Sequence, residues 1–236
     1  MSSPTMMPMS LEEIAQAVQG RLIAGTAAID TPVATSTFTD SRQIVEGSVF
    51  VAIAGERVDG HDYVSKVGAQ GAVAAIVDHE IDGAGVPQIV VEDTVLALGA
   101  LAKHNIERRR ALETPFTVIG ITGSVGKTTT KDLMKALLAH IGPTIAPVGS
   151  FNNEIGLPLT SLKVHAETRF LVAEMGANHV GEIANLTSLV PPDIAVVLKV
   201  GVAHLGEFGS PERIAQAKSE IIRGCLLYTS DAADDS

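Results

Sequence analysis

The chain has 236 residues, of which 46% are hydrophobic and only 3% aromatic, and its formal net charge is −10 at pH 7. A chain this acidic cannot neutralise a phosphate backbone, so nucleic acid is excluded as a partner. A single cysteine, Cys225, excludes an intrachain disulfide and fits a reducing, cytoplasmic compartment.

The N-terminal stretch "MSSPTMMPMS" lacks a basic region followed by an apolar run, so no signal peptide is expected. No apolar stretch approaches the roughly 20 residues that a membrane helix requires. We therefore expect no membrane insertion.

The first half of the chain alternates between helix and strand patterns. Ser10 and Glu13 form a capping box that opens a short helix ending at Gly20. The elements that follow are strands at 48–55, 72–78 and 87–92, a helix over 62–71 and a longer helix from 93 to about 110. This alternation predicts a small α/β domain over residues 1–112. Arg108, Arg109 and Arg110 are interpreted as cations at a helix C-terminus, beside a linker at 111–115.

The second half continues the alternation. We expect strands at 116–122, 169–176 and 191–201, helices at 128–141, from about 181 and from Ser210, and a loop at 149–162. Leu133, Leu137 and Leu138 share one face of the first of these helices. Three strands make a thin sheet, so the pattern predicts a truncated doubly wound domain over residues 113–224. Residues 225–236 leave the pattern and are interpreted as a non-native or disordered tail.

The stretch "GITGSVGKTTTKDL" (120–133) has the strand, glycine loop and helix of a phosphate-binding P-loop. It is the shorter form T-G-x-x-G-K-T, with Ile121 where the longer pattern has glycine. Lys127 can reach the terminal phosphates, and the Thr128 hydroxyl can bind Mg²⁺. The predicted nucleotide-binding residues are Thr122, Gly123, Ser124, Val125, Gly126, Lys127, Thr128 and Thr129.

Several polar residues follow the strands at the edge where a P-loop protein binds its metal ion. Glu174 ends an apolar strand and is either a metal ligand or a solvated strand-end carboxylate. His204 is either a ligand or an ordinary loop histidine. Lys218 has the pattern of a solvated helix lysine. Asn152 and Asn153 either bind substrate or simply form a turn.

Four stretches together resemble the Mur ligases in order and spacing, and most closely the MurF type. They are "TGSVGKTTTKDL", "GSFNNEIGLPLTSL", "AEMGANHVGEI" and "AHLGEFGSPERIAQAKSEI". The N-terminal stretches "TDSR" (39–42) and "GERVDGHDY" (55–63) resemble the uridine-nucleotide-binding domain of the same enzymes. The resemblance covers residues 10 to 223, and these enzymes carry the shorter P-loop.

The resemblance implies an ATP-dependent, ADP-forming amide ligase of peptidoglycan synthesis. A carboxylate of UDP-N-acetylmuramoyl-tripeptide would take the γ-phosphate as an acyl phosphate, which the amine of D-alanyl-D-alanine would then attack. It also implies the site residues: Lys127, Glu174, His204 and Lys218 for catalysis; Thr128, Glu174, His204 and a carbamylated Lys218 for Mg²⁺; Ser41 and Arg42 for the uridine nucleotide; Asn152 and Asn153 for the muramyl peptide.

Two alternatives stay open. A MurE-type ligase would add a diamino acid instead, although "FNNEIG" and "GANHVGEI" favour the MurF type. A GTPase-type switch would need an N-K-x-D stretch, and none occurs. Mur ligases have a further C-terminal domain, so we expect this chain to be inactive on its own. We also expect it to be a monomer.

Overall fold

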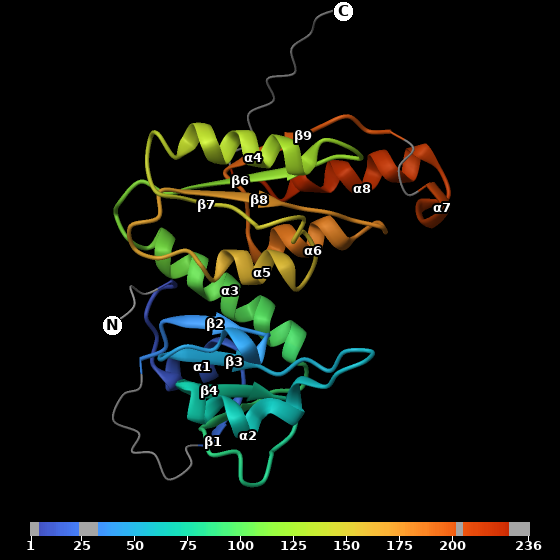
Figure 1. The fold of residues 1–236 in the computed structure, drawn as a ribbon. Coiled ribbons are helices and arrows are strands. Elements are labelled where there is room, and N and C mark those ends of the chain that lie inside the picture. Colours follow the sequence, from blue (N-terminus) through green and yellow to red (C-terminus); the bar gives the residue numbers. More distant parts are fainter. Residues whose placement is uncertain (1–4, 24–32, 202–204, 227–236) are drawn as a thin grey trace, which may run out of the picture. The chain divides into compact units, whose positions relative to one another are not determined.

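The computed structural model describes residues 5–23, 33–201 and 205–226, and the chain divides into two compact units. The first unit comprises residues up to Thr114 together with Glu154–Thr168. The second comprises Pro115–Asn153 and the residues from Arg169 onward. Each unit has its own sheet with helices packed on it (Figure 1).

The sheet of the first unit has five strands in the order β1-β5-β4-β3-β2, and only β1 runs antiparallel to its neighbour. The strands are β1 (Arg21–Ile23), β2 (Ser36–Phe38), β3 (Ser48–Val51), β4 (Ala72–Val77) and β5 (Gln88–Val90). Val49 and Val51 face a core shared with α1 (Leu11–Ala17) and α3 (Thr94–Arg110). Phe50 faces the opposite core with α2 (Val64–Val67). Side chains that alternate along a strand thus supply both cores.

Of the three predicted helices in this unit, those from Ser10 and Asp93 are confirmed at their starts, whereas the one over 62–71 is α-helical only at Val64–Val67, between 3-10 turns. The Ser10 hydroxyl accepts the Glu13 amide at 3.1 Å at the start of α1, and Asp93 accepts the amides of Val95 and Leu96 at the start of α3. The capping box is half formed, because the Glu13 carboxylate turns to His104 Nε2, 2.8 Å away, on α3. Tertiary contact has replaced the reciprocal local bond.

The predicted loop at 149–162 is wrong in part, because Gly156–Ser161 forms the helix α5. This helix packs beside α3 in the first unit, where Asn105 Nδ2 donates to the carbonyls of Ser161 and Val164. A six-residue helix is unstable alone. Its stability comes from α3, a partner that local sequence does not indicate.

The predicted arginine run does lie in the last turn of α3, but Arg109 is not a simple helix-end cation. Its side chain is buried, and Nε and Nη2 donate to the carbonyl of Thr168 at 3.0 and 2.7 Å. Burial lowers the pKa of its guanidinium, which still carries its charge. Arg109 therefore anchors Thr168, the last residue of the segment 154–168, within the first unit.

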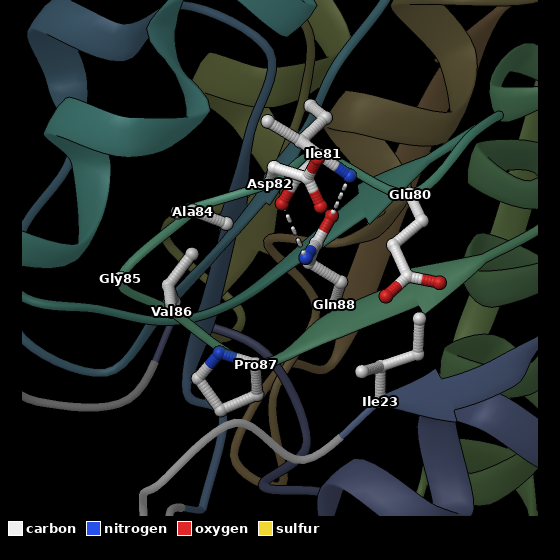
Figure 2. Close-up of a pocket in the computed structure, with 10 residues that line it drawn as sticks. Ile23, Glu80, Ile81, Asp82, Ala84, Gly85, Val86, Pro87 and Gln88 are labelled. Atoms are coloured by element: carbon white, nitrogen blue, oxygen red, sulfur yellow. Dashed lines mark hydrogen bonds between the residues drawn. The ribbon is translucent and has the colours of Figure 1, made fainter.

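One side chain closes the connection between β4 and β5 (Figure 2). Gln88 Oε1 accepts the Ile81 amide at 2.8 Å, and Gln88 Nε2 donates to the Ile81 carbonyl at 3.0 Å. The connection borders a hollow of about 310 Å³. Gly83 and Gly85 both have positive φ there, which lets the backbone turn between the two strands.

The sheet of the second unit is parallel throughout, with the order β7-β8-β6-β9. The strands are β6 (Thr117–Thr122), β7 (Thr144–Ile145), β8 (Phe170–Glu174) and β9 (Ile194–Val197), and the helices are α4 (Lys127–Leu138), α6 (Glu182–Leu189), α7 (Leu205–Phe208) and α8 (Pro211–Arg223). Met134 and Leu138 of α4 pack on one face of the sheet. Ile221 of α8 approaches Gly120 on the other face. Helices on both faces confirm the doubly wound α/β class.

Two details of this unit differ from the sequence prediction. The two-residue β7 was not predicted, because a run this short has no readable period. On α4, Leu133 and Leu137 are 60% and 68% exposed, whereas Lys131 is buried. Of the three leucines in the predicted stripe, only Leu138 packs on the sheet.

Candidate functional site

The loop between β6 and α4 has the backbone of an anion cradle. Gly123 and Gly126 have φ of +152° and +87°, and a Cβ on Gly123 would lie 2.7 Å from Leu198 Cβ. Gly126 is the N-cap of α4, and among the described residues no side chain caps the start of this helix. The first amides of α4 are therefore available to a phosphate, which the helix dipole also favours.

The side chains of the loop divide into two roles. Lys127 Nζ donates to the Gly123 carbonyl at 2.9 Å, and this places the ammonium over the cradle. Ser124 instead braces the loop, because its amide donates to the Lys199 carbonyl and its hydroxyl accepts the Gly201 amide at 3.0 Å. The Thr122 hydroxyl is buried without a partner among the described residues. A buried, unpaired hydroxyl beside the cradle fits a site built for a polar ligand.

Glu174 lies at the C-terminal end of β8, next to the P-loop strand, and is 1% exposed. Its Oε2 accepts the Thr128 hydroxyl at 3.2 Å, and its Oε1 accepts Asn152 Nδ2 at 2.9 Å. The structure thus brings together two residues predicted to bind metal. Their carboxylate and hydroxyl oxygens are ligands that Mg²⁺ prefers.

Lys218 is buried on α8, so its interpretation as a solvated lysine is wrong. Its Nζ donates to the Ala177 carbonyl at 3.1 Å and lies 5.4 Å from the centre of the Phe208 ring. Burial, reinforced by the positive charge of Lys127, lowers the pKa of its ammonium to about 8. The predicted ligand His204 lies outside the described residues.

The buried Lys218 predicts that stability rises at alkaline pH. Its pKa is lowered from 10.5 to about 8 in the fold, so the unfolded chain binds more protons between these values. The free energy of unfolding should then rise from about pH 8 to about pH 10, by up to about 3 kcal/mol. Denaturant titration in CO₂-free buffer should show this rise relative to Lys218→Met. If the free energy of unfolding changes with pH in the same way in both proteins, the prediction is wrong.

A second buried residue of α8, Glu220, was not predicted from the sequence. Its Oε1 accepts the Gly181 amide at 2.7 Å and its Oε2 accepts the Ala184 amide at 3.0 Å. Gly181 is the N-cap of α6 and has no side chain, so Glu220 caps that helix from α8. The available signal was a helix start without a capping residue. Lys218 and Glu220 together fix the loop from Ala177 to Gly181.

The first unit has a hollow of about 470 Å³ at the predicted uridine residues. It is lined by Thr39, Asp40, Ser41, Arg42, Phe50, Ile53, Val58, Gly60 and Tyr63. Asp40 accepts the Arg42 amide at 3.0 Å and Arg42 Nη2 at 2.7 Å, and this pairing lowers the pKa of Asp40 to about 2. Asp40 thereby sets the turn that presents Ser41 and Arg42 to the hollow.

His61 lies beside Asp78 and His79, which follow β4, and the potential ligand atoms of the three residues lie within 4.8 Å of one another. His61 Nδ1 lies 2.6 Å from Asp59 Oδ1, and its Nε2 accepts the Asp78 amide at 3.3 Å. Both ring nitrogens of the buried His61 are therefore already hydrogen-bonded. We interpret His61 as a residue that links two loops of the first unit.

Parallel strands, a P-loop and a carboxylate at the next strand end define a P-loop nucleotide-binding protein. The model "Mur ligase middle domain" matches residues 121–230, and "Mur ligase family, catalytic domain" matches residues 35–106. The chain belongs to the Mur ligase family.

The relatives are similar in sequence and structure. The UDP-N-acetylmuramoyl-tripeptide–D-alanyl-D-alanine ligase of Mycobacterium tuberculosis is 43% identical over 92% of this chain and 46% of its own length. The crystal structure of MurF from Acinetobacter baumannii matches with a TM-score of 0.82 at 40% identity, over 94% of this chain and 48% of that one. MurF ligase from Thermotoga maritima in complex with ADP matches with a TM-score of 0.70 at 39% identity, over 81% and 43%.

The chain spans about half the length of the curated relatives it matches. Among its described helices, none combines the length and apolar character needed to cross a membrane.

Proposed function

We propose that this chain supplies the UDP-muramyl-peptide-binding and ATP-binding parts of a cytoplasmic MurF-type ligase. The reaction joins D-alanyl-D-alanine to UDP-N-acetylmuramoyl-tripeptide and converts ATP to ADP and phosphate. The observation that carries the proposal is the P-loop with Thr128 and Glu174 hydrogen-bonded at adjacent strand ends. It occurs in a chain about 40% identical to MurF ligases.

The chemistry is a phosphoryl transfer followed by an acyl transfer. The tripeptide carboxylate attacks the γ-phosphorus, the bond to the β-phosphate oxygen breaks, and ADP leaves. The amine of D-alanyl-D-alanine then attacks the acyl carbon, loses a proton and displaces phosphate. Because the reacting groups are anions, positioning and charge neutralisation dominate catalysis. Lys127 and the amides at the start of α4 supply positive charge to the phosphates.

The residues present fit a Mg²⁺ ion. Thr128 and Glu174 would hold it, and His204 and a carbamylated Lys218 would serve a second ion. When bound, the ion would neutralise charge on the β- and γ-phosphate oxygens. The hard oxygen donors and the buried position of Glu174 support this assignment.

The substrate side of the proposal has two parts. Ser41 and Arg42 would bind the uridine nucleotide in the 470 Å³ hollow of the first unit, since a guanidinium and a hydroxyl suit a diphosphate. Asn152 and Asn153 would contact the muramyl peptide. The amide side chains of both can donate and accept hydrogen bonds.

The test has a binding arm and a turnover arm. The chain itself should bind ADP in preference to GDP, and UDP-N-acetylmuramoyl-tripeptide in preference to uridine, as measured by calorimetry. The entire gene product, given ATP, should ligate D-alanyl-D-alanine to the tripeptide substrate and should not ligate meso-diaminopimelate or lysine to the dipeptide substrate. Ligation of the diamino acid would favour the MurE type instead, and preference for GDP would favour a GTPase switch.

A further inference from the structure

Lys131, on α4, is a buried cation that the proposed chemistry does not use. Its side chain is 1% exposed. Its Nζ donates to the carbonyls of Pro147 at 2.9 Å and Gly149 at 3.0 Å, and lies 2.9 Å from Asp132 Oδ1. An ammonium has three N–H donors, so each has an acceptor. A buried charge is tolerated only when it is paired in this way, which fixes the position of the segment that carries the two carbonyls.

This segment connects β7 to α5 and has no helix or strand between residues 146 and 155. Between residues 147 and 153 the two large apolar side chains contribute little burial, because Val148 is 69% and Phe151 is 52% exposed. Polar contacts therefore account for its position. Lys131 holds its first part, and at its other end the Asn152 carbonyl accepts the Gly176 amide at 2.8 Å.

The segment places Asn152 against Glu174. Asn152 Nδ2 donates to Glu174 Oε1 at 2.9 Å, on the oxygen that Thr128 does not contact. A Cβ at Gly176 would lie 2.8 Å from Asn152 Cγ, so the glycine leaves room for this approach. An amide donor orients the carboxylate without neutralising it. An arginine or lysine in the same place would compete with a cation for the negative charge.

We infer that Asn152 is a positioning residue for the metal ligand Glu174, and that Lys131 positions Asn152 by holding the segment 147–149. The inference rests on the proposed nucleotide site, because it concerns how that site keeps its carboxylate oriented. Loss of a hydrogen bond to a metal ligand, from a residue that does not itself touch the metal, commonly lowers metal affinity by about 10- to 100-fold.

The first test is the variant Asn152→Leu, which keeps the side-chain volume and removes the donor. Two dissociation constants are measured: that of Mn²⁺ for the ADP-loaded chain, by electron paramagnetic resonance, and that of ADP alone in EDTA. We expect Mn²⁺ to bind about tenfold more weakly, while metal-free ADP binds as before. Asn185→Leu, the same change at an exposed position of α6, is the matched control and should alter neither constant.

The second test is the variant Lys131→Met, with Lys135→Met at an exposed position of the same helix as its control. Hydrogen exchange at the Gly176 amide should accelerate in Lys131→Met, because its acceptor on Asn152 is no longer held. Mn²⁺ affinity should fall as in Asn152→Leu. The double variant should lose little more than either single variant, since both act on one carboxylate.

The outcomes separate the two proposals. If the unaltered chain binds neither ADP nor Mn²⁺, the proposed function is wrong. If the unaltered chain binds both and Asn152→Leu retains full Mn²⁺ affinity, the positioning role is wrong while the nucleotide site stands. If the Gly176 amide exchanges as slowly in Lys131→Met as in the unaltered chain, the role of Lys131 is wrong. If Lys131→Met does not fold, Asn152→Leu decides the inference.

Discussion

Replacing Lys127 with alanine is expected to slow ligation by the entire gene product about 100-fold or more. The ammonium lies over the cradle formed by Gly123, Gly126 and the start of α4. It is a preorganised charge aimed at the phosphates, and loss of such a contact commonly costs about 10²- to 10³-fold in rate. The rate is measured as phosphate release with both substrates present.

The fold should survive this change. Lys127 is only partly buried, and its ammonium donates to a backbone carbonyl in its own loop, that of Gly123. Lys135→Ala, on the exposed side of the same helix, is the matched control and should keep the normal rate. A Lys127→Ala enzyme with near-normal turnover would show that this loop is not the phosphate site.

Lys218 is expected to be carbamylated in the metal-loaded protein, and its removal should abolish most activity. Only the neutral amine attacks CO₂, forming an N–C bond and releasing a proton. A lysine with a pKa of about 8 is neutral in about one molecule in ten at pH 7, far more than an ordinary lysine. The carbamate nitrogen keeps one N–H, which can still donate to the Ala177 carbonyl.

Two variants distinguish this role from a purely structural one. Lys218→Ala should lose most activity and recover part of it when small carboxylates such as formate are added, because they can occupy the vacated anion position. Lys218→Arg should stay inactive with the same addition, since it keeps a positive charge where a negative one is needed. Mass spectrometry after trapping of the carbamate gives an independent readout. A fully active Lys218→Arg protein would overturn the prediction.

The sequence alone was sufficient to predict the strand, glycine loop and helix start of the candidate nucleotide site. The P-loop is contiguous, so a strand, two glycines, Lys127 and a helix start can be read from one stretch. Glu174 could be placed because parallel strands present their C-terminal ends at one edge of the sheet. Helix starts at Ser10, Asp93 and Ser210 were also predictable, because each cap contacts an amide two or three residues away.

Other features depend on contacts between distant residues, which local patterns cannot indicate. Lys218 appeared to be a solvated helix lysine, yet the loop at Ala177 and the ring of Phe208 bury it and lower the pKa of its ammonium. Arg109 was predicted as a cation at a helix end, which it is, but the sequence did not indicate that it is buried against the carbonyl of Thr168, 59 residues away. Helix α5 is short and is stabilised by α3, so its own sequence was a poor guide.

The sequence by itself therefore determined the α/β class, the P-loop and the carboxylate that faces it, because each follows from residues close together or from the register of parallel strands. Only the tertiary structure decided which charged groups are buried, as with Lys131 and Lys218, and what holds Asn152 against Glu174. The physical reason is that burial and the pairing of a charge depend on what packs around it, whereas a turn or a helix start depends mainly on its immediate neighbours.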